Sequence, residues 1–226
     1  MLINCCSSPD DIFGDATTIS SSLGCHNAVS FDLTAACSGF LFGVVTATNF
    51  MSSPASSGRP VRNVLVIGSD ALSRWVDWSD RNSCILFGDG SGAMVMSRDK
   101  KYTDSKEPTG VMGYSMHSDG RGHNELKCSS SSSPVPVATP GDGLELSKGG
   151  YNPITMNGKK VYAFATREVP TVISEAMETA GVEVGDVDHL LLHQANIRIM
   201  ETVAKRLGVP MEKVREERAS EGPLGL

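Results

Sequence analysis

The chain has 226 residues, of which 40% are hydrophobic and 20% charged, so it can bury a core and form one large domain or two small ones. Twenty basic against 26 acidic residues give a net charge of −6, which argues against a protein held to nucleic acid mainly through its phosphates. No apolar run approaches the ~18 residues of a membrane span, and no secretion signal opens the chain. We therefore expect a soluble, folded protein with neither nucleic-acid nor membrane partners.

The six cysteines include no C-x-x-C pair and one vicinal pair, Cys5 and Cys6. This spacing indicates neither a zinc site nor a disulfide framework, so we expect reduced thiols and no bound metal. The first 58 residues contain no Lys or Arg, whereas an organelle transit peptide is rich in Arg. The sequence therefore shows no targeting peptide.

Strand and helix patterns alternate along the first part of the chain, which predicts α/β layers around a parallel sheet. Residues 1–6 read as the end of a strand, and residues 28–33 and 63–68 as buried strands. Helices are predicted over 13–23 and 38–50. The second helix is apolar nearly all round, which indicates that it lies inside the protein.

The middle of the chain carries a Gly-rich GDGSG at 88–92, between apolar residues. The lysine and following helix of a phosphate-binding loop are missing, so the motif predicts a tight turn followed by a strand. A further strand is predicted over 111–117. Residues 118–151 hold a serine run and several Gly and Pro, which indicates a long, poorly ordered surface loop.

The last part of the chain contains an apolar repeat of three and four over 159–180, which predicts an amphipathic helix. Residues 189–192 form a short apolar stretch typical of a strand, and a helix is predicted over 195–207, ended by Gly208. The order strand, reactive residue, helix therefore occurs twice. Cys37 is the reactive residue of the first copy and His193 that of the second.

Cys37 precedes the apolar helix, where N–H groups and the positive end of the helix dipole favour a thiolate and so a nucleophile. A small buried hydrophobic role fits a lone cysteine equally. His193 ends a strand, where ligands bind in α/β folds, although a histidine there can simply satisfy backbone groups. Together the thiol and imidazole favour nucleophilic catalysis.

Arg198 and Lys205 lie seven residues apart on the last predicted helix and therefore share one face. This basic patch on an acidic chain suits an acidic partner, and an ordinary solvated surface explains it as well.

Three segments carry a resemblance to a known family: AVSFDLTAACSGF at 28–40, ILFGDGSGA at 85–93 and LLLHQANIRIM at 190–200. Together they resemble beta-ketoacyl-acyl carrier protein synthase III, and DALSRWVDWSDR is most similar to plastid and cyanobacterial members. The resemblance implies a thiolase-like fold, two related α/β halves in an α-β-α-β-α layering, and a homodimer. It implies halves at 1–117 and 152–226, separated by a variable loop at 118–151.

The resemblance also implies an acyltransferase reaction without a cofactor. Cys37 takes an acetyl group from acetyl-CoA and condenses it with malonyl-acyl carrier protein, giving acetoacetyl-acyl carrier protein, CO2 and CoA. His193 stabilises negative charge on the thioester oxygen. Arg81 matches a contact to the CoA adenine, and Arg198, with Lys205 beside it, matches the carrier-protein surface.

The sequence departs from the family at both ends. The family's first strands and adenine-stacking tryptophan have no counterpart before Met1, and its G-N-T-S turn, with a catalytic asparagine, and following Gly-rich loop have none after Val214. We therefore expect a chain truncated at both ends. Two alternatives stay open: an impaired fragment that binds CoA, carrier protein or a full-length subunit, and a cysteine hydrolase. The resemblance places the protein in the plastid stroma if eukaryotic and otherwise in the cytoplasm.

Overall fold

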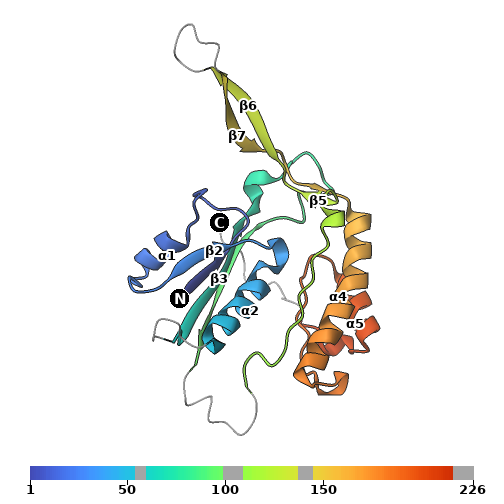
Figure 1. The fold of residues 1–226 in the computed structure, drawn as a ribbon. Coiled ribbons are helices and arrows are strands. Elements are labelled where there is room, and N and C mark those ends of the chain that lie inside the picture. Colours follow the sequence, from blue (N-terminus) through green and yellow to red (C-terminus); the bar gives the residue numbers. More distant parts are fainter. Residues whose placement is uncertain (54–59, 99–108, 137–144, 216–226) are drawn as a thin grey trace, which may run out of the picture.

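The computed structural model describes residues 1–53, 60–98, 109–136 and 145–215. A four-stranded sheet in the order β2-β1-β3-β4 lies in its N-terminal part (Figure 1). The strands are β1 (Leu2–Cys5), β2 (Ser30–Leu33), β3 (Asn63–Ala71) and β4 (Asp89–Ser97). β1 pairs in parallel with β2 and β3, whereas β4 runs antiparallel to β3. The predicted α/β class and the three parallel strands are confirmed.

Two helices pack on this sheet, α1 (Ala16–Ser22) and α2 (Gly39–Ser52). The core between α2 and the sheet is formed by Ile3, Cys5, Ala47, Met51, Val64 and Val66, which we call the sheet cluster. Gly43 allows α2 to approach closely, because a Cβ there would lie 2.5 Å from the Cys5 sulfur. The apolar helix is therefore packed directly on β1 by one face, whereas Leu41 and Phe50 on it are exposed, so it is not enclosed within the protein as its composition predicted.

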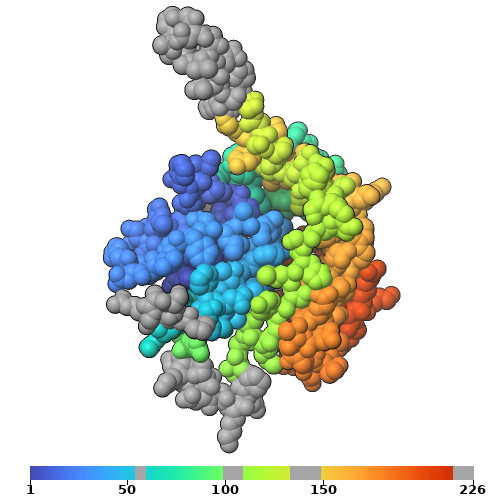
Figure 2. Space-filling model, in the orientation of Figure 1, coloured from blue at the N-terminus to red at the C-terminus, as the bar shows by residue number. Residues whose placement is uncertain are grey.

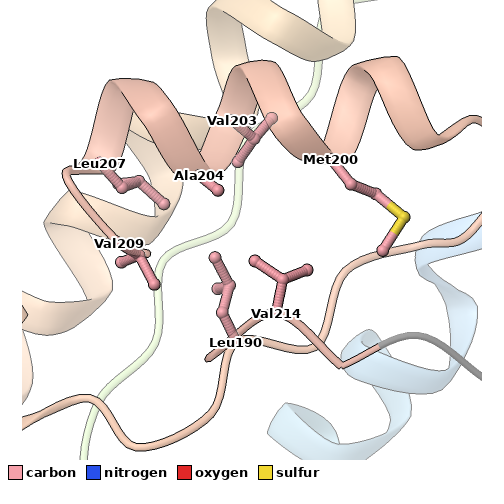
Figure 3. Packing of buried hydrophobic residues seen from close by; sticks show 7 residues of the cluster. All are labelled: Leu190, Met200, Val203, Ala204, Leu207, Val209 and Val214. Atoms are coloured by element: carbon pink, nitrogen blue, oxygen red, sulfur yellow. The ribbon is translucent and has the colours of Figure 1, made fainter. Parts of the chain in front are cut away.

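A second core lies under the long helix α4 (Gly158–Ala180) and α5 (Ile197–Leu207). Figure 3 shows its buried residues, which we call the helix cluster: Leu190, Met200, Val203, Ala204, Leu207, Val209 and Val214. Gly208 ends α5 with a φ of 73°, as expected for a glycine C-cap. The strand predicted over 189–192 is reduced to a single parallel bridge between Leu190 and Val214.

The segment between the two clusters, residues 109–119, is extended but forms no strand, so the strand predicted over 111–117 is wrong. Its partners are helices, which cannot supply a ladder of backbone hydrogen bonds. Ser115 Oγ donates to Glu175 Oε2 of α4 at 2.5 Å, and Tyr114 Oη donates to Asn49 Oδ1 of α2 at 3.3 Å. The segment therefore ties α2 to α4, as its path in Figure 1 shows.

The long surface loop predicted over 118–151 contains more regular structure than expected. β5 (Leu126–Lys127) pairs with β8 (Thr155–Met156), and β6 (Ser130–Pro136) with β7 (Glu145–Tyr151), both antiparallel. The β6–β7 hairpin projects from the rest of the molecule (Figures 1 and 2). Its central residues, 137–144, lie outside the described ranges.

Two smaller predictions also need correction. The turn predicted at 88–92 is largely strand, because Asp89–Gly92 belongs to β4 and pairs with Gly68–Ala71 of β3. The α5 helix begins two residues later than predicted, since Asn196 acts as its N-cap and accepts a hydrogen bond from the Arg198 N–H at 2.9 Å. None of the helices in the described ranges is long and apolar enough to cross a membrane.

Candidate functional site

Cys37 lies in a short turn that joins β2 to α2 at the carboxyl edge of the sheet. The turn is a single 3-10 segment, Ala36–Ser38, which leads directly into α2 at Gly39. Ala36 has a φ of 47°, in the left-handed region that a residue with a Cβ rarely adopts. Strained backbone of this kind persists where the surrounding structure holds it, and it is frequent at functional sites. It presents Cys37 as an exposed thiol at the helix N-terminus.

The acidity of this thiol differs from the expectation drawn from the helix dipole. Although the residue as a whole is exposed, crowding of protein atoms around the sulfur raises the pKa of Cys37 above its usual range. Its own backbone N–H lowers the pKa, and the negative charge of Asp70 raises it. The thiol is therefore the favoured form in the free chain, and a nucleophilic role requires that substrate binding or a base assist its ionisation.

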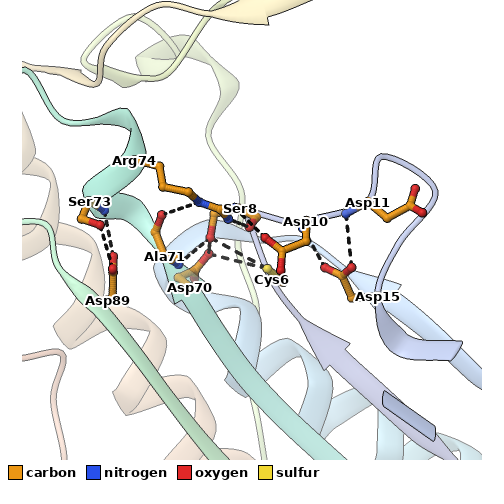
Figure 4. A network of polar contacts seen from close by, with 10 residues as sticks. All are labelled: Cys6, Ser8, Asp10, Asp11, Asp15, Asp70, Ala71, Ser73, Arg74 and Asp89. Carbon is orange, nitrogen blue, oxygen red and sulfur yellow. Dashed lines mark hydrogen bonds and ion pairs between the residues drawn. The ribbon is translucent and has the colours of Figure 1, made fainter. Parts of the chain in front are cut away.

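A polar network surrounds this edge, and sequence reasoning did not single it out. Asp70, at the end of β3, accepts a hydrogen bond at Oδ1 from the Ser8 hydroxyl at 2.8 Å (Figure 4) and another from the Ser7 N–H at 2.8 Å. The Cys6 thiol lies 3.9 Å from the same oxygen. The signal that could have found this cluster is the position of Cys6 and Asp70, each at the carboxyl end of an apolar strand.

Arg74 fastens the loop after β1 to the end of β3. Its guanidinium pairs with Asp10 at 2.6 Å and donates to the carbonyl oxygens of Ser8 and Ala71 (Figure 4). It follows β3 in a 3-10 segment, Leu72–Trp75. Arg74 therefore joins the loop after β1 to the end of β3.

His193 is exposed and lies three residues beyond the Leu190 bridge, in the segment that leads to α5. Within the described ranges no hydrogen bond or ion pair joins its imidazole to Cys37. The predicted helix after the histidine is present, whereas the strand predicted before it is reduced to the Leu190 bridge. Its role as an oxyanion donor stays a prediction.

The predicted binding residues are all exposed. Arg81 lies in a turn held by Asp77 and Asp80, whose carboxylates accept hydrogen bonds from Ser79 and from Asn82 and Ser83; these bonds lower the pKa of both acids.

Arg198 and Lys205 are also exposed, on an amphipathic α5 whose opposite face packs in the helix cluster. The shared exposed face is as predicted, and the carrier-protein contact stays a prediction. Among the residues that the structure describes, no group of three or more His, Cys, Asp or Glu is placed to hold a metal ion.

Known proteins match the chain in both sequence and fold. The profile of the 3-oxoacyl-[acyl-carrier-protein (ACP)] synthase III family matches residues 31–120, and that of its C-terminal part matches residues 177–221. Beta-ketoacyl-[acyl-carrier-protein] synthase III of Thermosynechococcus vestitus is 47% identical over 214 residues, which cover 95% of this chain and 60% of that protein. The corresponding protein of Microcystis aeruginosa is 47% identical over 208 residues, which cover 92% of this chain and 58% of that protein.

Solved structures show the same relationship. FabH, 3-oxoacyl-(acyl carrier protein) synthase III of Pseudomonas aeruginosa PAO1, superposes with a TM-score of 0.77 at 27% identity, covering 96% of this chain and 60% of that one. The synthase III of Aquifex aeolicus VF5 gives 0.75 at 32% identity, covering 94% and 59%. The fold is thus thiolase-like, and partial relative to full-length structures.

This is the fold class that the motifs implied. Within it, the chain belongs to the beta-ketoacyl-acyl carrier protein synthase III family, a family of acyltransferases of fatty-acid biosynthesis. It spans about 60% of the length of the curated relatives that it matches.

Proposed function

We propose that this chain carries the acyl-transfer half of a synthase III reaction, with Cys37 as the residue that takes an acetyl group from acetyl-CoA. The observation that carries the proposal is the Cys37 turn: a strained Ala36 presents an exposed thiol at the N-terminus of an apolar helix, within the stretch that matches the family. Attack by the thiol forms a thioester and releases CoA. The N–H groups at the start of the helix suit the negative charge that develops on the thioester oxygen.

The subsequent condensation with malonyl-acyl carrier protein would give acetoacetyl-acyl carrier protein and CO2. His193 supplies the hydrogen bond that stabilises the developing charge on the malonyl thioester oxygen. Arg81 contacts the adenine of CoA. These roles rest on the family resemblance and on the exposure of both side chains, which leaves them accessible to a substrate.

Labelling with radioactive acetyl-CoA tests the first step directly. The 226-residue chain should take up about one acetyl group, and mass spectrometry of the labelled peptides should place it on Cys37. Cys37→Ser should lose the label, whereas Cys25→Ser, which removes another exposed thiol, should keep it. Label on Cys25 or Cys84, or equal labelling of Cys37→Ser, would overturn the proposal.

A second candidate is a binding role without turnover, in which the chain holds CoA, carrier protein or a full-length subunit. The observation that favours it is the 60% coverage of the relatives, since the segment with the family's catalytic asparagine lies outside the match. Retained acetyl-CoA binding without transfer to Cys37 would support this role.

The assembly and location follow the family. We propose that the protein is a homodimer and that its chain is divided into two thiolase-like halves, 1–117 and 152–226, joined by a variable segment at 118–151. We further propose that it works in the plastid stroma of a eukaryote or the cytoplasm of a bacterium; the relatives named above are cyanobacterial. Sedimentation of the purified chain tests the dimer.

A further inference from the structure

The residues after β1 form a bridge between the Cys37 turn and the end of β3. On one side, the Cys6 N–H donates to the Leu33 carbonyl at 3.1 Å, and the Ser7 hydroxyl lies within hydrogen-bond distance of the Thr34 hydroxyl at 3.1 Å. Leu33 is the last residue of β2, and Thr34 begins the connection to Cys37. The backbone that leads to the nucleophile is therefore held by residues 6–8.

On the other side, the same bridge is held by the Asp70 carboxylate and by Arg74, which donates to the Ser8 carbonyl oxygen. Asp70 Oδ1 accepts from the Ser7 N–H and the Ser8 hydroxyl, and the Cys6 thiol lies near it. The Ser8 hydroxyl in turn accepts from the Ala71 N–H at 2.7 Å, which locks the bridge to the backbone of β3. A carboxylate that accepts several hydrogen bonds fixes its donors more firmly than a neutral group does.

The order of the strands explains why one residue can act on both sides. β1 lies between β2 and β3, with Cys5 opposite Leu33 on one side and opposite Gly68 on the other. Residues that continue β1 beyond Cys5 must therefore pass between the Cys37 turn and Asp70. Every polar contact named for this bridge ends either on the β2 side or on the β3 side.

We propose that Asp70 is a positioning residue for Cys37: it holds residues 6–8 in place, and these residues hold the turn that presents the thiol. The inference rests on the proposed role of Cys37 as the acylated residue. Asp70 does not touch the acyl group in this proposal. Its charge has a second effect, because it adds to the raised pKa of the Cys37 thiol, of which burial of the sulfur is the main cause.

Two substitutions separate position from charge. Asp70→Asn keeps an oxygen that can accept from Ser7 and Ser8 but removes the charge, whereas Asp70→Ala removes both. Asp89→Asn is the matched control. Asp89 is the first residue of β4, opposite Ala71 at the end of β3, and its carboxylate likewise accepts hydrogen bonds from a backbone N–H and a hydroxyl, both of Ser73. All three are tested in the full 226-residue chain.

The first readout is the pH profile of alkylation of Cys37 by iodoacetamide, followed on the Cys37 peptide by mass spectrometry. Asp70→Asn should move the midpoint to lower pH by several tenths of a unit, which speeds alkylation near neutral pH about twofold. Asp89→Asn should leave the midpoint unchanged. A purely structural role for Asp70 would not move this profile.

The second readout is deuterium uptake in peptides that cover residues 4–13 and 33–40. Asp70→Ala should raise uptake in both, and Asp70→Asn should restore protection. Unchanged uptake over 33–40 in Asp70→Ala, an unshifted profile in Asp70→Asn, or equal effects of Asp89→Asn would each overturn the proposal. Failure of the unmodified chain to take acetyl from acetyl-CoA would instead overturn the proposed function, because neither readout depends on acyl transfer.

Discussion

The two clusters of the molecule differ in how they fix the chain around a reactive residue. In the N-terminal part, the turn of Cys37 follows β2, an edge strand of the four-stranded sheet whose four residues all pair with β1, and a polar network ties the turn to β3 through residues 6–8. In the C-terminal part, the segment of His193 follows a single bridge, held by the Leu190 N–H to Lys213 at 2.8 Å and the Arg215 N–H to Leu190 at 3.0 Å. The backbone that precedes Cys37 is therefore held by more strand pairing than the backbone that precedes His193.

The comparison teaches that a buried core does not by itself define a site. Both clusters contain residues that are completely buried, such as Ile3 in one and Val203 in the other. What differs is the number of paired strands beside the reactive residue. We therefore expect the proposed acyl transfer to Cys37 to proceed more readily in the 226-residue chain than the proposed step that uses His193.

The largest expected effects come from truncating core residues. Ile3 and Met200 are 0% and 2% exposed, and replacing either with alanine leaves a cavity that should lower the free energy of unfolding by about 2–5 kcal/mol. Val95→Ala, on the exposed face of β4, is the control and should change it by less than about 0.5 kcal/mol. Urea titrations measure all three. A loss well below this range for Met200 alone would show that the helix cluster is loosely packed.

The next effect concerns condensation. The resemblance implies two oxyanion donors, of which the proposed role of His193 supplies one; losing one such donor costs about 3 kcal/mol, or roughly a hundredfold or more in rate. Acetyl-enzyme should therefore accumulate in single-turnover assays with malonyl-acyl carrier protein. A version extended with the family's asparagine turn and Gly-rich loop is the comparison. Equal condensation rates in the two proteins would refute the expectation that condensation is the slower step in the 226-residue chain.

A smaller effect is expected at the surface of α5. Arg198→Glu places a negative charge on the exposed face that it shares with Lys205, and it should weaken carrier-protein binding about tenfold, mainly through the association rate. The exposed Lys127→Glu, on β5, reverses a charge away from α5 and serves as the control. If the contact is electrostatic, carrier-protein binding to the unmodified chain should also be weaker at the higher of two salt concentrations. Salt-independent binding that survives Arg198→Glu would mean an ordinary solvated surface.

Relief of strain at Ala36 gives a still smaller effect. Its φ of 47° suits glycine, so Ala36→Gly should raise the free energy of unfolding by about 0.5–1 kcal/mol, after the greater flexibility of glycine in the unfolded chain is subtracted. Ala35→Gly, one residue earlier at a φ of −149°, should instead lower it. Thermal unfolding measures both. A loss of stability in Ala36→Gly would show that the left-handed conformation carries little strain.

Local pattern was sufficient for the elements that pack an apolar face. The sheet strands and the helices α2, α4 and α5 follow from apolar periodicity, because burial rewards that spacing directly. Residues 111–117 have a strand-like composition but face helices, and Leu190 forms one bridge where a strand was expected. In both places the structure is decided by partners that lie far away in sequence, which a local pattern does not reveal. The position of Cys37 was predictable from the motif. Its raised pKa was not, because it comes first from burial of the sulfur by surrounding atoms and only then from the charge of Asp70, which lies 33 residues away in sequence.

The smallest effect lies between the two clusters, at Asp119. Its carboxylate accepts hydrogen bonds from the Arg121 side chain at 2.7 Å and from the Arg121 N–H at 3.0 Å, which lower its pKa to about 2; the charge of Arg167 on α4 contributes less. Because the folded pKa lies below the ordinary value near 3.8, the stability from this group is present above about pH 4 and is lost as the pH falls through 2.

NMR titration of the Asp119 carboxyl measures this pKa directly. Arg121→Ala should raise it part of the way to the ordinary value, because the variant removes the side-chain hydrogen bonds and the charge of Arg121 but keeps its backbone N–H. Arg167→Ala should raise it only slightly, because Arg167 acts through its charge alone. Added salt should weaken the effect of the exposed Arg167 on this pKa more than that of the Arg121 hydrogen bonds, because Arg167 acts through its charge alone. Equal pKa shifts in the two variants would mean that Arg167 on α4 stabilises the Asp119 carboxylate as strongly as Arg121 does. The segment between the sheet cluster and the helix cluster would then be bound to α4 more tightly than the separate cores suggest.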